Sequence, residues 1–406
     1  MKLYWHSTAP WSTSSYSVLS ARTVPNIARL GYEVVLGAWY GLQGQPLPWT
    51  ITEEGKPNKS VLVLPNAGGH AYGADTIQAS YEHWKCDALI TCSDVWIFTP
   101  AQTHTTNFCP WLPVDHDPVP EPIVSALNPA MYPMVYSKFG VEMLERAGVK
   151  SHYVPCSAPA DFYKPGDKAE ARKLLNIPAN CDFLVSMVAA NKDGSDRKAF
   201  GEALQGFAQF RQAHPNAYIY IHTNWSGPIN IAAMAKSLDI RENVIMCDQY
   251  AYNFNLLDEN YMRGVYQASD LLLNPCKAEG FGLPIVEAQM CGCPVAATDF
   301  ATTDEILFAG WKLKGQPDWS PGADSWRRTV YISEVVSALE EGYKNRGNEK
   351  LAQKARNGAL RFDTSTVFNQ YWKPALKEIE ALINKGKIFF ANGKGVTAIE
   401  KEKVLA

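Results

Sequence analysis

The sequence predicts an α/β protein with two doubly wound parallel sheets. Three observations lead to this fold class. The chain has 406 residues, which exceeds the usual size of a domain with a single hydrophobic core. Short apolar runs alternate with helical segments, as in parallel α/β sheets. A break rich in proline at Pro155–Lys168 then separates two such series. We therefore expect one domain over residues 1–160 and a second over residues 166–360.

In the first half, apolar runs predict strands and the segments between them predict helices. The expected strands are Lys2–Trp5, Tyr32–Ala38, Val61–Leu64, Ala88–Cys92, Phe108–Val114, Met134–Tyr136 and His152–Val154. The expected helices are Tyr16–Leu30, Asp75–Trp84, Glu121–Asn128 and Lys138–Ala147. Gly31 and Gly148 follow two of these helices, where glycine commonly ends a helix.

The alternation restarts after the break. The expected strands are Phe183–Ala189, Tyr218–His222, Val244–Cys247, Leu271–Asn274 and Pro294–Thr298. The expected helices are Lys198–Ala213, Asn230–Leu238, Asp258–Ala268 and Pro284–Cys291. The last regular element expected is a long amphipathic helix over Thr364–Lys385. Ligands of doubly wound sheets bind beyond the carboxyl ends of the strands.

Composition and charge describe an ordinary globular protein. Hydrophobic residues make up 46% of the chain and charged residues 19%, with a net charge of −3. Residues 1–165 hold 10 Lys and Arg against 13 Asp and Glu, so this half carries 10 − 13 = −3. Nucleic acids and anionic membranes normally require a basic excess, so the charge does not support such partners.

The nine cysteines form no CxxC pair and no spaced metal quartet. Several lie inside apolar runs, which is typical of reduced, buried thiols in a cytosolic protein. The N-terminus resembles a strand rather than a secretory signal, and no apolar stretch is long enough to span a bilayer. We therefore expect a cytoplasmic protein without a metal site and without a tightly bound cofactor.

The most informative segment follows the strand that ends at Asn274. Gly280 and Gly282 allow the backbone to approach a ligand closely. Pro284 then takes an early helical position, where its missing N–H costs nothing. The amide groups of a helix start, together with the helix dipole, favour an anion such as a diphosphate.

Two carboxylates flank this predicted anion site. Glu287, expected in the first helical turn, has enough acceptor positions to hold both ribose hydroxyls of a nucleotide. Glu279 precedes the turn and would face the other end of the ligand. In the competing interpretation Glu287 is a helix-dipole acid and the glycines are turn residues. A two-carboxylate hydrolase is another competitor, although a glycine loop at a helix start suits phosphate binding better than bond-flanking acids.

Glu279 and Glu287 stand eight positions apart, and the run resembles the glutamate-x7-glutamate signature of retaining glycosyltransferases of family four. That resemblance implies the GT-B fold, with two Rossmann-like domains facing a central cleft. It also implies that Glu287 holds the ribose and that Glu279 holds a hydroxyl of the transferred sugar. The main-chain amides that would hold phosphate and sugar oxygens are those of Gly280, Phe281, Gly282 and Leu283.

The same resemblance extends to the loop after strand Phe183–Ala189. Family members carry basic residues there that grip the donor diphosphate, and Arg197 and Lys198 match the last two of them. Fixed cations stabilise the negative charge that grows on the departing diphosphate. An adjacent Arg-Lys pair is also common at a solvated helix start. Asn191 departs from the family, whose members often carry arginine at this position.

In the first domain, the segment around Ser14–Ser17 resembles the opening loop of the family, in which glycines replace Ser15 and Ser17. His116 resembles the active-site histidine of relatives, which would orient the transferred sugar. His116 could instead be a structural ion partner. Asp115 is then the rival candidate for the active-site residue. Asp94 could bind acceptor hydroxyls or be an ordinary loop aspartate.

The resemblance implies a hexosyltransferase-like enzyme that moves a sugar from a nucleotide-diphosphate donor, UDP- or GDP-linked, to a hydroxyl acceptor. The anomeric configuration would be retained and no metal would be required. Asp248 and Tyr250 are the candidates for the base-proximal loop. The helix over Thr364–Lys385 fits the family habit of crossing back onto the first domain. Two alternatives stay open, a catalytically impaired sugar-nucleotide-binding protein and a sugar-nucleotide epimerase.

Overall fold

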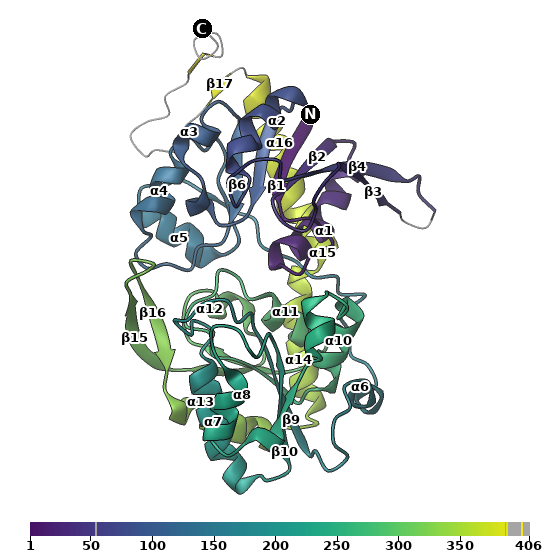
Figure 1. Cartoon of the computed structure of the whole chain (residues 1–406), viewed down its shortest axis with the longest axis vertical. Helices are drawn as coiled ribbons and strands as arrows, with labels where there is room; N and C mark the ends of the chain where they lie inside the picture. The colour runs from purple at the N-terminus through teal and green to yellow at the C-terminus, as the bar shows by residue number, and fades with distance from the viewer. Residues whose placement is uncertain (53–54, 386, 389–398, 401–406) are drawn as a thin grey trace. The chain divides into compact units, whose positions relative to one another are not determined.

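The computed structural model describes residues 1–52, 55–385, 387–388 and 399–400 (Figure 1). By their internal contacts the residues divide into two compact units. Unit 1 comprises Met1–Ser157, Ala323–Ser325 and Thr364–Ala406. Unit 2 comprises Ala158–Gly322 and Trp326–Asp363.

Unit 1 is built on a sheet with the strand order β3-β4-β2-β1-β5-β6-β7-β8. Its pairings are parallel except for the edge strand β3, which runs antiparallel to β4. The strands are β1 (Lys2–Ser7), β2 (Glu33–Ala38), β3 (Leu47–Ile51), β4 (Lys59–Pro65), β5 (Ala88–Cys92), β6 (Phe108–Leu112), β7 (Met134–Val135) and β8 (His152–Tyr153). The helices are α1 (Ser15–Arg29), α2 (Ile77–His83), α3 (Pro100–Thr103), α4 (Glu121–Leu127) and α5 (Lys138–Arg146). Gly31 and Gly148 adopt positive φ after α1 and α5, as their predicted role requires.

Unit 2 contains a parallel sheet with the strand order β11-β10-β9-β12-β13-β14. Its strands are β9 (Phe183–Val188), β10 (Ala217–His222), β11 (Val244–Met246), β12 (Leu271–Asn274), β13 (Val295–Thr298) and β14 (Gly310–Leu313). Its helices are α6 (Lys168–Leu174), α7 (Phe200–Ala213), α8 (Ile231–Ser237), α9 (Gln249–Asn253), α10 (Glu259–Ala268), α11 (Leu283–Met290), α12 (Thr303–Ile306), α13 (Ile332–Lys344) and α14 (Glu349–Ala359). The order places β9 beside β12, so the loops that follow these two strands leave the same edge of the sheet.

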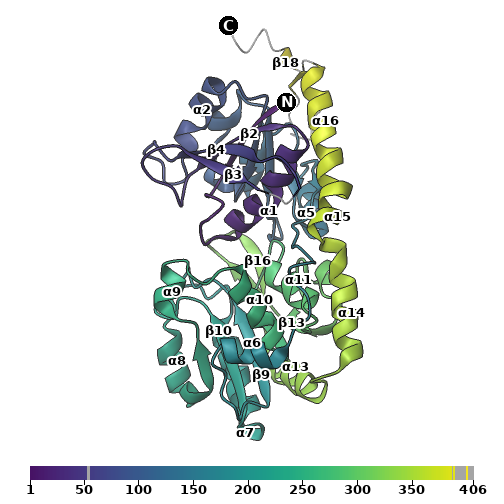
Figure 2. The ribbon, with the colours of Figure 1, turned by 90° about the vertical axis from the view of Figure 1, so that its right-hand side faces the viewer.

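The last long helix belongs to unit 1 (Figure 2). It runs through α15 (Thr364–Val367), a π-helical turn over Phe368–Trp372 and α16 (Lys373–Asn384), close to the predicted range. Pro374 has no N–H to bond the carbonyl four residues earlier, which accounts for the wider turn there. Trp372 is buried, with its ring centroid 4.8 Å from that of Trp111 and 5.8 Å from that of Trp5.

Several elements differ from the sequence prediction. No element was predicted between Thr298 and Thr364, yet this stretch contains β14, the helices α12, α13 and α14, and a two-stranded sheet of β15 (Gly315–Ser320) and β16 (Ser325–Val330). The edge strand β3 was also missed, because Pro48 and exposed side chains hide its pattern. The helix expected from Lys198 begins at Phe200, so Lys198 lies in the loop before it.

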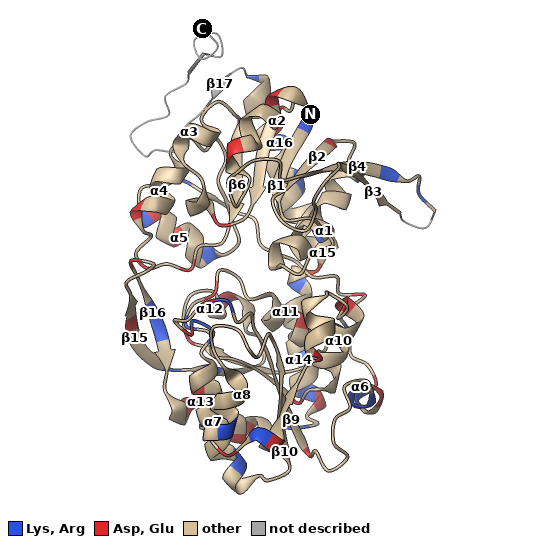
Figure 3. Cartoon of the chain, in the orientation of Figure 1, with Lys and Arg blue, Asp and Glu red and all other residues tan. Residues whose placement is uncertain are grey.

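The nine cysteines are all buried thiols that form no disulfide among the described residues, as predicted. Both Lys or Arg and Asp or Glu residues occur along the described ribbon of each unit (Figure 3). Within the described residues, none of the helices combines the length and apolar character of a membrane span. Over the same residues, no group of three or more His, Cys, Asp or Glu side chains is arranged to hold a metal ion.

Candidate functional site

The loop with Glu279 leads from β12 into α11. Gly282 stands directly before the helix with a φ of 94°, a left-handed conformation that favours glycine. A Cβ at this position would also lie 3.1 Å from Cδ1 of Ile285 and of Ile306. The hydroxyl of Thr302 donates a hydrogen bond of 2.9 Å to the carbonyl of Phe281, which fixes the loop. The result is a rigid glycine turn at a helix N-terminus, a setting that favours an anion.

Lys198 and Glu279 meet at this turn, although 81 positions separate them in the chain. Lys198 Nζ lies 2.6 Å from Glu279 Oε1, and the two side chains are 14% and 21% exposed. Burial alone would raise the pKa of Glu279, but the charges of Lys198 and Arg197 and the hydrogen bond from Lys198 hold that pKa below its usual value. The carboxylate therefore stays ionised at neutral pH.

Arg197 joins the same two loops. Its Nη1 donates to the carbonyl of Ala278 over 2.8 Å and lies 3.8 Å from Sγ of Cys276. The amide of Lys277 in turn donates to the carbonyl of Arg197 over 2.9 Å. The two predicted basic residues and Glu279 thus lie together, because β9 and β12 are neighbours in the sheet.

Glu287 is the fifth residue of α11, which corrects its predicted place in the first turn. Its side chain is 7% exposed, and Tyr266 donates a hydrogen bond of 2.9 Å to Oε2. Tyr266 comes from the buried face of α10 and is 1% exposed. Burial and the charge of Glu287 raise the pKa of Tyr266 well above its usual value, so the hydroxyl keeps its proton. Tyr266 was not predicted as a site residue, because no local sequence motif marks it.

Asn191, which stands where relatives often carry arginine, forms hydrogen bonds within the protein. The residue is 6% exposed, and its Nδ2 donates to the carbonyls of Asn224 and Ile229 over 2.8 and 2.7 Å. Its Oδ1 accepts from the amide of Ile229 over 3.1 Å. Asn191 therefore ties the loop after β9 to the loop after β10.

Asp248 and Tyr250 follow β11, the edge strand of the sheet. Asp248 caps α9 by accepting from the amide of Ala251 over 2.8 Å, so the expected loop is a short helix. Tyr250 is 67% exposed, with its ring centroid 4.5 Å from that of Phe254. Strands β10 and β9 lie between β11 and β12. Asp248 and Tyr250 therefore lie at the same edge of the sheet as the Glu279 loop, but two strands separate them from it.

The serine-rich loop after β1 in unit 1 forms a cluster of hydroxyl groups. Ser17 is fully buried, and its Oγ lies 2.7 Å from Oγ1 of Thr8 and 2.8 Å from Oγ of Ser14. Ser14 caps α1 by accepting from the amide of Ser17. Ser15, by contrast, is the exposed first residue of α1. The side chain that replaces one family glycine thus points inward, and the other points to solvent.

Asp94 follows β5, which lies next to β1, and Asp115 and His116 follow β6, the next strand of the sheet. The hydroxyl of Tyr16 donates to Oδ2 of Asp94 over 2.7 Å. Burial, Asp94 and, more weakly, Asp115 raise the pKa of Tyr16 well above its usual value. His116 Nδ1 lies 3.2 Å from Oδ1 of Asp115. The structure thus gathers these candidates at one edge of the unit 1 sheet.

Comparison with known proteins gives the site a family context. Residues 192–310 match the family described as "Glycosyl transferases group 1". A protein of Segniliparus rotundus described as D-inositol 3-phosphate glycosyltransferase is 30% identical over 200 residues, which cover 47% of this chain and 39% of that protein. A protein of the same description from Mycobacterium sp. (strain KMS) is 33% identical over 142 residues, which cover 34% and 29%. The chain therefore aligns with well under half the length of these relatives.

Solved structures match over nearly the whole chain. Sucrose-phosphate synthase from Thermosynechococcus elongatus superposes with a TM-score of 0.69 at 14% identity, covering 95% of this chain and 98% of that one. Anabaena HepE, solved in complex with UDP and glucose, superposes with a TM-score of 0.65 at 16% identity, covering 93% and 100%. At such identities the likeness establishes the fold and confirms the predicted architecture. The chain has the GT-B fold, and its residues 192–310 match the glycosyl transferases group 1 family.

Proposed function

We propose that the protein is a retaining glycosyltransferase that moves a sugar from a nucleotide-diphosphate donor to a hydroxyl acceptor. Unit 2 would bind the donor and unit 1 the acceptor. The observation that carries the proposal is the Lys198–Glu279 pair of 2.6 Å beside the glycine turn of α11. Both residues lie inside the segment that matches the glycosyl transferases group 1 family.

The donor diphosphate lies, in this proposal, against the start of α11, in contact with the main-chain amides of residues 280–283. Lys198 and Arg197 come from the neighbouring loop and supply two positive charges. Negative charge grows on the diphosphate as the glycosidic bond breaks, and these fixed cations stabilise it without reorganisation. Lys198 would then be shared between Glu279 and the phosphate, which leaves Glu279 oriented toward the sugar. We expect no requirement for a divalent metal.

Glu287 binds both ribose hydroxyls of the donor in this proposal. The hydroxyl of Tyr266 already donates a hydrogen bond to Oε2 of Glu287, so the carboxylate does not have to be ordered when the nucleotide binds. UDP is the nucleotide we favour, because Anabaena HepE was solved with UDP. Asp248 and Tyr250 are the candidates for contacts with the base.

His116, Asp115, Asp94 and Ser15 are the acceptor-side candidates in unit 1. Asp94 and Asp115 could accept hydrogen bonds from acceptor hydroxyls, since a carboxylate has about four acceptor positions. Tyr16 occupies one of these positions on Asp94. His116 would hydrogen-bond the transferred sugar. The nine reduced cysteines favour the cytoplasm as the site of the reaction.

The test is a titration of the full chain with UDP, GDP, ADP and TDP and their glucose conjugates by calorimetry, with and without EDTA. We expect one nucleotide to bind in EDTA, and E287A to weaken its binding at least tenfold. E349A, which removes an exposed glutamate from the first turn of α14, is the matched control and should bind like the wild type. Failure of every nucleotide to bind, with or without Mg²⁺, would contradict the proposal.

Turnover separates the alternatives. A glycosyltransferase releases UDP and forms a product whose anomeric configuration, read by NMR, is that of the donor. An epimerase changes the donor sugar without releasing UDP, and an impaired binding protein does neither. E279Q should keep nucleotide affinity within about threefold and lose most of the turnover, because its carboxylate contacts the sugar and not the nucleotide in this scheme.

A further inference from the structure

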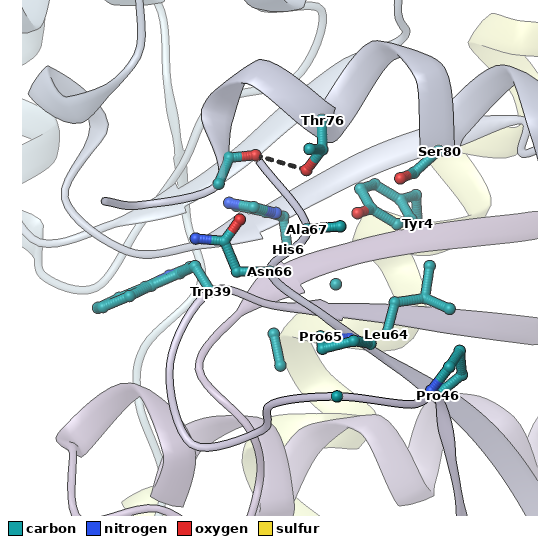
Figure 4. A pocket seen from close by; sticks show the side chains of 14 residues that line it. Tyr4, His6, Trp39, Pro46, Leu64, Pro65, Asn66, Ala67, Thr76 and Ser80 are labelled. Carbon is teal, nitrogen blue, oxygen red and sulfur yellow. Dashed lines mark hydrogen bonds between the residues drawn. The ribbon is translucent and has the colours of Figure 1, made fainter. Parts of the chain in front are cut away.

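A cavity of about 270 Å³ opens in unit 1 at the carboxyl ends of β1, β2 and β4 (Figure 4). Its volume is below the ~300–1,000 Å³ of pockets that hold drug-sized ligands, so it suits one small group. The polar side chains that line it are Tyr4, His6, Trp39, Asn66, Thr76 and Ser80. None of these is a Lys, Arg, Asp or Glu.

Two ring nitrogens of this cavity are buried and lack a hydrogen-bond partner among the described residues, His6 Nδ1 and Trp39 Nε1. His6 is 2% exposed, and its Nε2 lies 2.9 Å from the carbonyl of Tyr72. A carbonyl only accepts, so Nε2 carries the proton and Nδ1 presents a lone pair. Burial lowers the pKa of His6 to about 4, which keeps the ring neutral at pH 7. The cavity thus offers one neutral acceptor and one neutral donor.

An aromatic cluster of Trp39, Tyr40, Tyr72 and Trp96 adjoins the cavity. The ring centroids of Trp39 and Tyr72 are 5.2 Å apart, and those of Tyr72 and Trp96 are 6.1 Å apart. Tyr40 and Trp96 are 54% and 49% exposed, although rings of this size gain free energy by burial. Exposed rings beside neutral hydrogen-bonding groups match the two faces of a sugar ring, one of C–H groups and one rimmed by hydroxyls.

Five of the loops at this edge of the sheet contain no Lys or Arg. Residues 8–14, 39–46, 66–73, 93–99 and 113–120, which follow β1, β2, β4, β5 and β6, include no Lys or Arg. They do include three acidic residues, Asp94, Asp115 and Asp117. Recognition of a phosphate group normally uses Arg or Lys. An anionic acceptor would therefore meet like charge and no counter-charge on these loops.

We propose that this edge of unit 1 binds a neutral saccharide as the acceptor, with one sugar ring stacked on the aromatic cluster and its polar groups hydrogen-bonded to His6 Nδ1 and Trp39 Nε1. This inference rests on the proposed transferase activity and names its acceptor class. It separates the protein from the curated relatives, whose descriptions name a phosphorylated inositol.

The test measures saturation-transfer NMR of the full chain in the presence of UDP. The neutral probes are methyl hexopyranosides, maltose, cellobiose and lactose, and the anionic probes are inositol 3-phosphate and glucose 6-phosphate. We expect at least one neutral sugar to bind and each phosphorylated probe to bind at least tenfold more weakly. W39F removes the N–H donor but keeps a ring, and H6Q keeps a donor for Tyr72 but removes the ring acceptor. Each should weaken sugar binding about fivefold, the effect of one neutral hydrogen bond.

W319F is the control, because Trp319 is an exposed tryptophan on β15 that does not line the cavity. It should leave sugar binding unchanged. The inference is overturned if inositol 3-phosphate binds as well as the neutral sugars, or if no neutral sugar binds. It is also overturned if W39F and H6Q both bind sugar like the wild type, provided that their unfolding temperatures show both variants to be folded. UDP affinity of the same samples is a separate readout: its absence defeats the proposed function, whereas the sugar signal alone decides the acceptor site.

Discussion

The hydroxyl of Tyr266 donates a hydrogen bond of 2.9 Å to Oε2 of Glu287, and both side chains are buried. The two residues come from neighbouring helices, α10 and α11. A buried carboxylate without such a donor would be costly to keep charged. The contact therefore gives the carboxyl group of Glu287 a hydrogen-bond donor at the position where we propose that the ribose binds.

Y266F removes this hydrogen bond and keeps the ring. Because hydrogen bonds to charged groups contribute about 1.5–3 kcal/mol, we expect the free energy of unfolding to fall by about that amount in urea titrations. The affinity for UDP should fall about tenfold by calorimetry, since the carboxylate loses its orientation. A variant as stable as the wild type, with the same UDP affinity, would show that Tyr266 does not support Glu287.

The Lys198–Glu279 pair predicts a pH dependence of stability. The pKa of Glu279 in the folded protein lies below its ordinary value of 4.5, so the pair stabilises the fold above that pH and the effect disappears as the pH falls through the folded pKa. E279Q lacks it. We expect the wild type to be more stable than E279Q by about 1 kcal/mol at pH 7, with the difference vanishing below pH 4.5. A difference that grows on acidification would contradict this.

Asn191 should matter for stability more than for nucleotide binding. N191A leaves the carbonyls of Asn224 and Ile229 and the amide of Ile229 without their partner. We expect the free energy of unfolding to fall by about 2–4 kcal/mol, because buried unpaired polar groups are costly. N357A, at an exposed position of α14, should change it by less than about 0.5 kcal/mol. If N191A weakens UDP binding but not folding, the structural role assigned to Asn191 is wrong.

Trp372 connects the last long helix to the core of unit 1. W372A removes a side chain that contacts both Trp5 and Trp111, and we expect a loss of about 3–5 kcal/mol in the free energy of unfolding. W372F should lose less, because it keeps a ring. Thermal unfolding of the two variants tests the order. Equal stability of W372A and wild type would mean that the helix does not contribute to unit 1.

The parts of the fold and site that sequence predicts are those with local signals. The glycine turn and Pro284 mark the start of α11, and Glu287 follows by spacing. The resemblance assigned Lys198 and Glu279 to the same donor site, but their direct contact was not predicted, because it depends on β9 and β12 being neighbours. The contact of Glu287 with Tyr266 has no local signal, since it depends on how α10 packs beside α11.

The elements that were not predicted differ in the strength of their sequence pattern, which is clear in α13 and weak in α14, β15 and β16. Helix α13 buries Val335, Ala338, Leu339 and Gly342 at helical spacing, a pattern that the sequence does contain. Helix α14 buries only Ala355 and Ala359, so its periodicity is weak. The sheet of β15 and β16 alternates little, because most of its side chains are exposed or half-buried. The residues Ala158–Ala160, at the end of the range predicted for the first domain, belong to unit 2.

Because Trp372 belongs to unit 1, the order of synthesis leaves that unit unfinished for a long time. Ribosomes add about 5–20 residues per second, so Trp372 follows Ser157 by roughly ten to forty seconds. During that interval Trp5 and Trp111 have no Trp372 to cover them. The nascent chain therefore presents an aromatic surface of the kind that chaperones bind, and an isolated fragment of residues 1–157 would keep that surface permanently.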